Sequence, residues 1–296
     1  MKTHEASPKR WVGRQALSSI EFTYPVDGFP ISSELKGGAR LHGAQKGSMA
    51  DKPLVTIITS TYHAAEHLPT AIESIREQTY GNVEWIVVDG ASKDGTLDIL
   101  RQNEDVIDYW VSEPDKGIYD AWNKGLSLAR GEWILFLGAD DQIVSDAIEV
   151  MVKVGTSSPI PLDFVCGKVE LYRGPSLIRT IGKPWSWRRF KKYMCVAHTG
   201  AMHSASYFDR HGVFDNSFRI SGDYEVLLRA GARLKAAFVP KVLARMQVGG
   251  ESNRSSAVFQ EALRARLMHA VTTPLAGRVD AVWAECKWNI RRLFGL

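Results

Sequence analysis

The sequence contains few cysteines, and their spacing rules out two classes of protein. Cys166, Cys195 and Cys286 are odd in number, far apart and without Cys-x-x-Cys spacing. This pattern argues against a disulfide framework and against a zinc site. A reducing compartment fits best, so we expect a cytoplasmic protein.

Long apolar runs are also missing. No stretch approaches the roughly 18 consecutive apolar residues of a membrane-spanning helix. The N-terminal segment MKTHEASPKRWVGRQ is charged and is not followed by the apolar stretch of a secretory signal. We therefore expect a protein that is neither integral to a membrane nor exported by a standard signal.

Charge of one sign is not in excess. The net charge is +4, and 45% hydrophobic with 24% charged residues is ordinary for a soluble globular protein. The totals give no reason to expect a nucleic-acid partner. A chain of 296 residues can form one large α/β domain with appendages. Function must therefore be read from local clusters.

The chain changes character at residue 53. Residues 1–52 contain proline and glycine and little periodicity, which predicts an N-terminal extension laid on a domain or partly disordered. Beyond it, apolar runs expected to be strands lie at 54–62, 83–90, 108–113 and 132–138. Helical patterns lie at 65–79, 94–103, 117–130 and 146–154. The looser second half contains an expected strand at 164–172, a helix from 222, a strand pair within 236–248 and two terminal helices.

This alternation predicts an α/β fold with a mixed, mostly parallel sheet flanked by helices. Ligands of such sheets bind where the strands end, at their carboxyl edge. The polar clusters described next all follow strand ends.

Two adjacent carboxylates, Asp140 and Asp141, follow the buried run 132–138. Neighbouring carboxylates repel unless a cation lies between them, and hard oxygen ligands suit Mg²⁺ or Mn²⁺ bridging a diphosphate. The alternative is that one of them caps the next helix, although Ser145 and Asp146 already stand at its start. The sequence favours a metal site.

A second cluster suits a nucleotide. Asp89 ends the second strand and would lie beside Thr59 and Tyr62, which end the first. Together they offer an acceptor, a hydroxyl and an aromatic face for a base and ribose. The alternative is that Asp89 and Asp94 are turn and helix-cap residues.

A third cluster lies in EPDKGIYDAWNKG. Asp120, Asn123 and Lys124 share one helix face, and a solvated ion pair is one interpretation. The other is that Asp115 and Lys116, just before the helix, approach a phosphate or ribose at its N-terminus.

The segments VTIITSTY, VVDGASKDGT, EPDKGIYDAWNKG and WILFLGADD, in this order, resemble the nucleotide-sugar-binding half of family 2 glycosyltransferases with the GT-A fold. The resemblance covers about residues 53–250. It implies a nucleoside-diphosphate sugar donor, with UDP as the expected nucleotide, a divalent metal on a DxD-like motif, and inversion by direct displacement. It also implies a nucleotide-sugar-binding half at 53–142 and an acceptor half at 143–255, followed by a C-terminal helical segment at 256–296.

The resemblance assigns residues to roles. It implies metal binding by Asp140 and Asp141, and contacts to the nucleotide sugar by Thr59, Tyr62, Asp89, Asp94, Lys116 and Asp140. One position departs from the pattern, because the family often has Asp-x-Asp-Asp and here Gly138 takes the first place. Which carboxylate is the main metal ligand stays open.

Direct displacement needs a base that takes the proton of the acceptor hydroxyl. FRISGDYEVLLRAG resembles the family's Glu-Asp segment, with Gly222 in place of the Glu and Asp223 at the Asp. Asp223 is therefore the predicted base, with an N-cap role as the alternative and Glu225 in reserve.

The acceptor side is represented by two further segments. AHTGAMHSAS resembles the family's acceptor segment, where His198 is a site candidate or alternatively a satisfied core residue. QVGGESNRSS resembles a flexible loop near the diphosphate, with Ser252 and Arg254 as phosphate contacts.

Two basic and aromatic segments are not among the motifs that carry the resemblance. Residues 185–193 (WSWRRFKKY) suit single-stranded nucleic acid, sugars or an anionic membrane, or form a solvated loop. The last helix carries Val279, Val282 and Trp283 on one side, and we expect it to pack on the protein or on a second subunit rather than on a membrane.

The sequence therefore predicts an inverting glycosyltransferase of exopolysaccharide or lipopolysaccharide assembly. Its expected partners are a nucleoside-diphosphate sugar and a glycan or polyprenyl-diphosphate-linked acceptor, met in the cytoplasm at the inner face of the plasma membrane. One alternative is a nucleotidyltransferase, which would usually have a basic, Gly-rich loop where this chain has TSTYHAAEH. Another is a non-catalytic module that binds sugar nucleotides or lipids.

Overall fold

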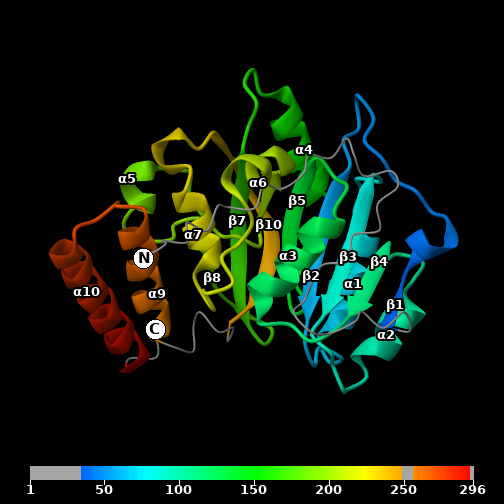
Figure 1. Cartoon of the computed structure of the whole chain (residues 1–296), viewed down its shortest axis with the longest axis horizontal. Helices are drawn as coiled ribbons and strands as arrows, with labels where there is room; N and C mark the ends of the chain where they lie inside the picture. Colours follow the sequence, from blue (N-terminus) through cyan, green and yellow to red (C-terminus); the bar gives the residue numbers. More distant parts are fainter. Residues whose placement is uncertain (1–34, 249–255, 294–296) are drawn as a thin grey trace, which may run out of the picture.

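A single ten-stranded sheet organises the computed structural model, which describes residues 35–248 and 256–293 (Figure 1). The strand order is β1-β4-β3-β2-β5-β9-β7-β10-β6, and β8 pairs with β7. The strands are β1 Lys36–Gly37, β2 Val55–Thr61, β3 Val83–Asp89, β4 Tyr109–Ser112, β5 Trp133–Gly138, β6 Gln142–Ile143, β7 Phe164–Arg173, β8 Ser176–Ile181, β9 Ala201–Ser204 and β10 Ala236–Gln247.

Helices fill most connections between the strands. They are α1 Leu68–Arg76, α2 Thr96–Gln102, α3 Ile118–Leu128, α4 Ala147–Ser157, α5 Trp187–Phe190, α6 Ala205–His211, α7 Gly222–Leu228, α9 Ala257–Met268 and α10 Pro274–Leu293, with 3-10 turns η3 Ala39–His42 and η4 Gly231–Arg233. Pro69 lies in the first turn of α1, where its missing N–H removes no helical hydrogen bond.

Strands β4, β3, β2 and β5 run parallel, so their carboxyl ends meet at one edge. Strand β9 is antiparallel to both β5 and β7, and it joins the two predicted halves into one continuous sheet. The predicted α/β architecture, a mixed and mostly parallel sheet between helices, is confirmed.

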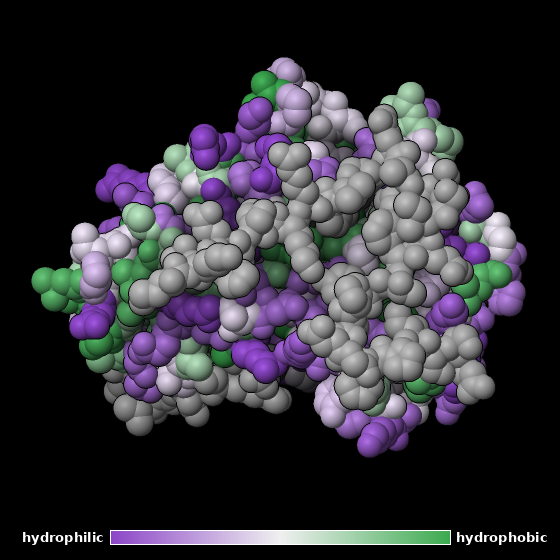
Figure 2. Space-filling model, viewed as in Figure 1, coloured by the Kyte–Doolittle hydropathy of each residue, from purple (hydrophilic) through white to green (hydrophobic). Residues whose placement is uncertain are grey.

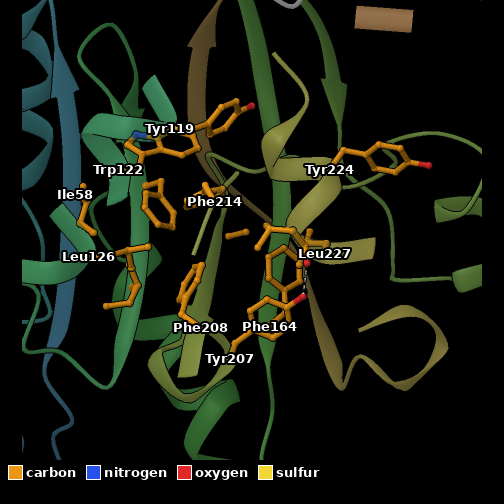
Figure 3. Close-up of a cluster of buried hydrophobic side chains, with 14 of the residues drawn as sticks. Ile58, Tyr119, Trp122, Leu126, Phe164, Tyr207, Phe208, Phe214, Tyr224 and Leu227 are labelled. Atoms are coloured by element: carbon orange, nitrogen blue, oxygen red, sulfur yellow. Dashed lines mark hydrogen bonds between the residues drawn. The ribbon is translucent and has the colours of Figure 1, made fainter. Parts of the chain in front are cut away.

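Apolar side chains cover both faces of the sheet. One core packs under α1 and α4, and the other packs under α3, α6 and α7. In the second core, Tyr119 and Trp122 of α3 pack on Phe214, which also contacts Phe208, and Ile58 of β2 belongs to the same cluster (Figure 3). Burial on both faces explains why the parallel strands are continuous apolar runs in the sequence.

One expectation for the second half was wrong, and one strand was missed. Residues 236–247 form the single strand β10, with register shifts around Val242, instead of a strand pair. Pro240 lies just before that irregularity, and a residue without an N–H is accommodated at such a bulge. Strand β6 was not expected, and its pairing with β10 places the chain after Asp141 against the second half.

The described part of the N-terminal extension covers a sheet edge. Strand β1 pairs with β4, Arg40 forms an ion pair with Glu84, and Lys46 lies 2.8 Å from Asp108. An edge strand covered in this way cannot pair with another chain. Cys166, Cys195 and Cys286 are free thiols.

Candidate functional site

The acidic pair Asp140 and Asp141 stands at the carboxyl end of β5. A Cβ atom placed on Gly138 would lie 2.9 Å from Asp140 Oδ1 and 2.8 Å from Asp141 Oδ2. Both carboxylates therefore turn back over residue 138, and a side chain at this position would require them to shift. Gly138, which stands where the family often has Asp, thus lies directly beneath the two carboxylates of the acidic pair.

The surroundings of this pair fit a divalent cation. Burial raises the pKa of Asp141 to about 7, and the charge of Asp140 adds to the rise. Thr199 donates to Asp141 Oδ2 at 3.2 Å. Neither aspartate caps α4, since this helix begins at Ala147. Within 35–248 and 256–293, no third acid, histidine or cysteine completes a metal cluster. Mg²⁺ or Mn²⁺ held by these two carboxylates would take its other ligands from a diphosphate and water.

Asp89 is buried and fully engaged by the protein. Its carboxylate accepts hydrogen bonds from the hydroxyls of Thr61 (2.8 Å), Ser92 (2.6 Å) and Ser112 (2.6 Å), and from the Ser92 N–H. These bonds tie together the ends of β2, β3 and β4. Asp89 therefore fixes the shape of the rim.

Thr59 and Tyr62 lie in opposite environments. Thr59 is completely buried, and its hydroxyl accepts a hydrogen bond from the Trp85 indole at 3.0 Å. The hydroxyl of Thr59, which we expected to contact a nucleoside, is therefore turned into the core. Tyr62 is 66% exposed and stacks on His63, so its outer face is open to a base.

Asp94 and Lys116 also differ. Asp94 accepts from the backbone N–H groups of Thr96 (3.0 Å) and Ala65 (3.1 Å), so it caps the start of α2 and pins the loop after β2. This is the turn-and-cap alternative. Lys116 has an exposed side chain, while its N–H donates to Asp120. Its ammonium group remains a predicted phosphate contact.

The polar face of α3 is buried, so the solvated ion pair was the wrong interpretation. Lys124 is 2% exposed and lies 2.7 Å from Glu113 Oε1. Asn123 bonds both the N–H and the carbonyl of Phe214 at 2.9 Å. This network attaches α3 to the loop that precedes Asp223 in the chain.

Asp223 lies in the first turn of α7, half-buried. Its Oδ1 accepts from the Tyr224 N–H at 2.8 Å. The Tyr119 hydroxyl lies 3.4 Å from the same oxygen and shares its one proton with a closer acceptor, the Ile220 carbonyl at 2.7 Å. Burial raises the pKa of Asp223 to about 6, and these hydrogen bonds oppose the rise. Tyr119 belongs to the first turn of α3, which follows the carboxyl end of β4. Asp223 is thus joined to the edge that carries the acidic pair.

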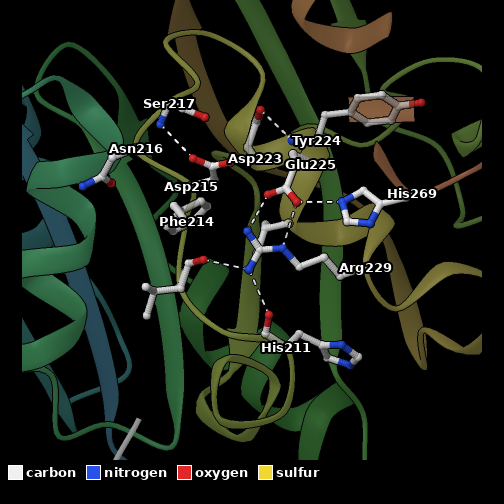
Figure 4. Close-up of polar contacts among 12 residues, drawn as sticks. His211, Phe214, Asp215, Asn216, Ser217, Asp223, Tyr224, Glu225, Arg229 and His269 are labelled. Atoms are coloured by element: carbon white, nitrogen blue, oxygen red, sulfur yellow. Dashed lines mark hydrogen bonds and ion pairs between the residues drawn. The ribbon is translucent and has the colours of Figure 1, made fainter. Parts of the chain in front are cut away.

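Glu225, the reserve candidate for the base, has a structural role. Its carboxylate accepts two bonds from Arg229, at 2.9 and 2.5 Å, and lies 2.7 Å from His269 Nε2. Although burial opposes it, these contacts lower the pKa of Glu225. Arg229 also donates to the carbonyls of His211 and Val213 (Figure 4). Glu225 is therefore not available to a substrate.

His198 packs in the aromatic core. Its Nε2 lies 3.0 Å from His203 Nε2, and its ring stacks on Trp122 and Phe136. Burial lowers the pKa of His198 to about 4, so it is neutral at pH 7. Its neighbour Thr199, which the sequence interpretation passed over, is the residue that reaches the acidic pair. The signal was the polar hydroxyl that directly follows His198 in the sequence.

Residues 56–208 match the sequence model described as glycosyl transferase family 2. The PGL/p-HBAD biosynthesis glycosyltransferase of Mycobacterium bovis (strain BCG / Pasteur 1173P2) is 31% identical over 215 residues, which are 68% of this chain and 80% of the relative. The chain belongs to glycosyltransferase family 2.

Solved structures show the same fold. S. aureus TarS residues 1–349 in complex with UDP-GlcNAc gives a TM-score of 0.61 at 16% identity, covering 77% of this chain and 69% of that one; the chain spans 41% of the longer TarS chain. Mannosyltransferase PcManGT from Pyrobaculum calidifontis, in complex with GDP-Man and Mn²⁺, gives 0.55 at 21% identity, covering 76% and 65%. The glycosyltransferase therefore has the GT-A fold.

A cavity of about 230 Å³ opens beside the acidic pair of this glycosyltransferase. Asp140 and Gln142 form one wall, and Arg245, which lies 3.5 Å from Glu170, brings a cation to the other. Ser252 and Arg254 lie outside the described residues, a few positions after Gln247 of the same cavity. Arg245 was not anticipated, because β10 was not recognised as one strand.

Proposed function

We propose that this glycosyltransferase is an inverting enzyme that moves a sugar from a UDP-linked donor to a hydroxyl of a glycan or lipid-linked acceptor in cell-surface polysaccharide synthesis. The observation that carries the proposal is the pair of carboxylates turned over Gly138 at the carboxyl edge of the sheet. The UDP-GlcNAc bound to TarS and the biosynthetic name of the mycobacterial relative support it.

The donor would lie along the rim. Asp140 and Asp141 would hold Mg²⁺ or Mn²⁺, which when bound supplies positive charge to the departing diphosphate. The Tyr62 ring offers a face to the base, and the Lys116 ammonium offers a cation to a phosphate. Asp89 keeps the three strand ends in register beneath them.

The acceptor would meet Asp223. Its carboxylate takes the proton of the attacking hydroxyl, while the Tyr119 hydroxyl, bonded to the same carboxylate, orients it. Attack on the sugar face opposite the leaving group inverts the anomeric carbon. A nucleotidyltransferase or a non-catalytic module would not need a base at this position.

Asp141→Ala should weaken Mn²⁺-dependent UDP binding at least about tenfold, since even the residues that support metal ligands contribute 10–100-fold to metal affinity. Isothermal calorimetry with and without Mn²⁺ measures the effect. Asp146→Ala is the matched control, because Asp146 is a nearby acid paired with Lys241. Equal UDP affinity in the wild type and Asp141→Ala, at saturating Mn²⁺, would refute the site.

The outer face of α10 supports a membrane contact. Val279, Val282 and Trp283 are 61–62% exposed, so these three side chains do not pack on the protein itself, and of the two expected partners a second subunit is left. Lys287 lies over the Trp283 ring, and the basic segment with α5 lies at the same end of the molecule (Figure 1). Figure 2 shows hydrophobic side chains gathered at this end. Among the described helices, none has the length and hydropathy to cross a bilayer. We therefore place α10 on an anionic bilayer surface.

Val282→Glu should reduce binding to phosphatidylglycerol-containing vesicles roughly tenfold, because it replaces an inserting apolar group with a charge the surface repels. Co-sedimentation measures this, with pure phosphatidylcholine vesicles for comparison. As a control, Ile160→Glu likewise replaces an exposed aliphatic side chain with Glu, in the loop after α4, where Ile160 is 51% exposed. The face binds a second copy instead if the wild type does not bind the vesicles but forms a dimer, and if Val282→Glu converts this dimer to a monomer.

A further inference from the structure

A second cavity, of about 290 Å³, lies between α7 and the C-terminal helices α9 and α10. Its walls are mostly apolar, and its main apolar side chains are Met194, Ile220, Val258, Phe259, Leu263 and Ala284. Asp223, the proposed base, forms part of the same wall. The cavity is therefore a neighbour of the reacting hydroxyl, on the side away from the family's donor motifs.

Arg266 gives this cavity an unusual polar feature. The side chain is 5% exposed, and one terminal nitrogen donates to Asp280 Oδ2 at 2.7 Å. Its Nε–H is buried and has no hydrogen-bond partner among the described residues. Buried donors are nearly always paired, so this N–H calls for an oxygen that the described part of the chain does not supply.

The size and lining restrict what can enter. Val258, Phe259 and Leu263 are only partly buried, so the protein's own core does not fill the space between the helices. A volume near 300 Å³ is the lower end of small-molecule sites and excludes an oligosaccharide. A bare sugar ring would leave its hydroxyls unpaired against apolar walls. An aromatic ring or a short alkyl segment meets neither difficulty.

We propose that this cavity binds an apolar group, an aryl ring or a short alkyl segment, carried by the acceptor next to its reactive hydroxyl. The Arg266 Nε–H donates to the oxygen that links this group to the rest of the acceptor, and the seated group delivers the hydroxyl to Asp223. The inference rests on the proposed function, because it takes Asp223 as the base. It makes the acceptor a glycoside or alcohol with an apolar aglycone rather than a free sugar.

Direct binding of two matched probes tests the cavity. Phenyl β-D-glucoside should bind at least about tenfold more tightly than methyl β-D-glucoside, because only the phenyl ring has apolar area to bury. Saturation-transfer NMR and calorimetry measure this on the full chain, with and without UDP and Mn²⁺. Equal affinity of the two glucosides, or no binding of either, would overturn the proposal.

Two variants locate the binding. Ala284→Phe fills the cavity from α10 and should abolish the preference for the phenyl compound, whereas Ala276→Phe, the same change at an exposed site of the same helix, should keep it. Arg266→Lys keeps a charge facing Asp280 but removes the Nε–H, and should weaken phenyl glucoside binding several-fold. If Ala284→Phe does not fold, Arg266→Lys still decides: a lower melting temperature with unchanged affinity would assign Arg266 a purely structural role.

The readout separates this inference from the function on which it rests. If the wild type shows no Mn²⁺-dependent UDP binding, the proposed function is refuted. The preference for phenyl over methyl glucoside is measured independently of this result. If the protein binds UDP and transfers sugar equally to methyl and phenyl glucosides, the proposed function stands and the proposed role of the cavity is refuted.

Discussion

Asp223→Asn is expected to lower sugar transfer by about 10²–10⁴-fold, the usual contribution of a general base. The amide keeps the shape of the side chain and can still accept the hydrogen bonds from Tyr224 and Tyr119, but it cannot take the proton of the acceptor. UDP affinity should stay within about twofold, since Asp223 lies on the acceptor side. Product formation under steady-state conditions and UDP calorimetry measure the two effects.

The pH profile supplies an independent check on the same residue. Burial raises the pKa of Asp223 to about 6. The carboxylate is the active form, so kcat/KM should fall about tenfold per pH unit below that value, well above the usual carboxyl pKa of about 3.9. Tyr119→Phe removes a hydrogen bond that opposes the rise and should move the acidic limb to higher pH.

Asp215→Asn is the matched control for this prediction. Asp215 lies in the loop before α7, and its carboxylate accepts a hydrogen bond from the Ser217 N–H (Figure 4). Transfer by Asp215→Asn should remain close to wild type. An Asp223→Asn variant that keeps more than a tenth of the activity would show that another group is the base.

The strands and helices of the first half of the fold could be predicted because local sequence patterns determine them. Parallel strands buried on both faces leave continuous apolar runs, and their helices show one apolar stripe each. Strands β2, β3, β4 and β5 accordingly lie within the predicted runs. The rim followed from them, because the carboxyl ends of parallel strands must meet.

The second half of the fold depends on strand pairings between distant segments, which no local sequence pattern indicates. Pro240 divides β10 into two apparent runs, and two-residue β6 exists only because β10 lies beside it. The apolar stripe of α10 was visible, but which side faces the protein was not. In the structure the small residues Gly277 and Ala281 face inward, and Val279, Val282 and Trp283 face out.

The site shows the same division. Motif spacing placed Asp140, Asp141 and Asp223, yet it could not show that Thr59 points inward. The Thr199 contact to Asp141 spans 58 positions and the Tyr119 contact to Asp223 spans 104. Tertiary packing brings such partners together, so no local sequence pattern predicts these contacts.

Glu225→Gln is expected to destabilise the protein by about 3–5 kcal/mol, the typical result of removing one partner of a buried ion pair. The amide leaves the Arg229 guanidinium buried without a counter-charge, and it weakens the link to His269 that holds the end of α9 against α7. Urea unfolding followed by circular dichroism measures the free energy of unfolding. Glu149→Gln is the control: this exposed acid, bonded only to Thr79 in the described structure, should change stability by less than about 0.5 kcal/mol.

The same variant separates the two acids of α7 as candidates for the base. If Glu225 only holds the fold, Glu225→Gln protein that remains folded at low temperature should still transfer sugar and keep the acidic limb of the pH profile near 6. A folded Glu225→Gln protein that binds UDP normally but transfers nothing would assign the proton transfer to Glu225. A loss of stability below about 1 kcal/mol would contradict the buried ion pair instead. Because Asp223→Asn changes rate without removing an ion pair, and Glu225→Gln changes stability without removing the base, the two variants should fail in different measurements.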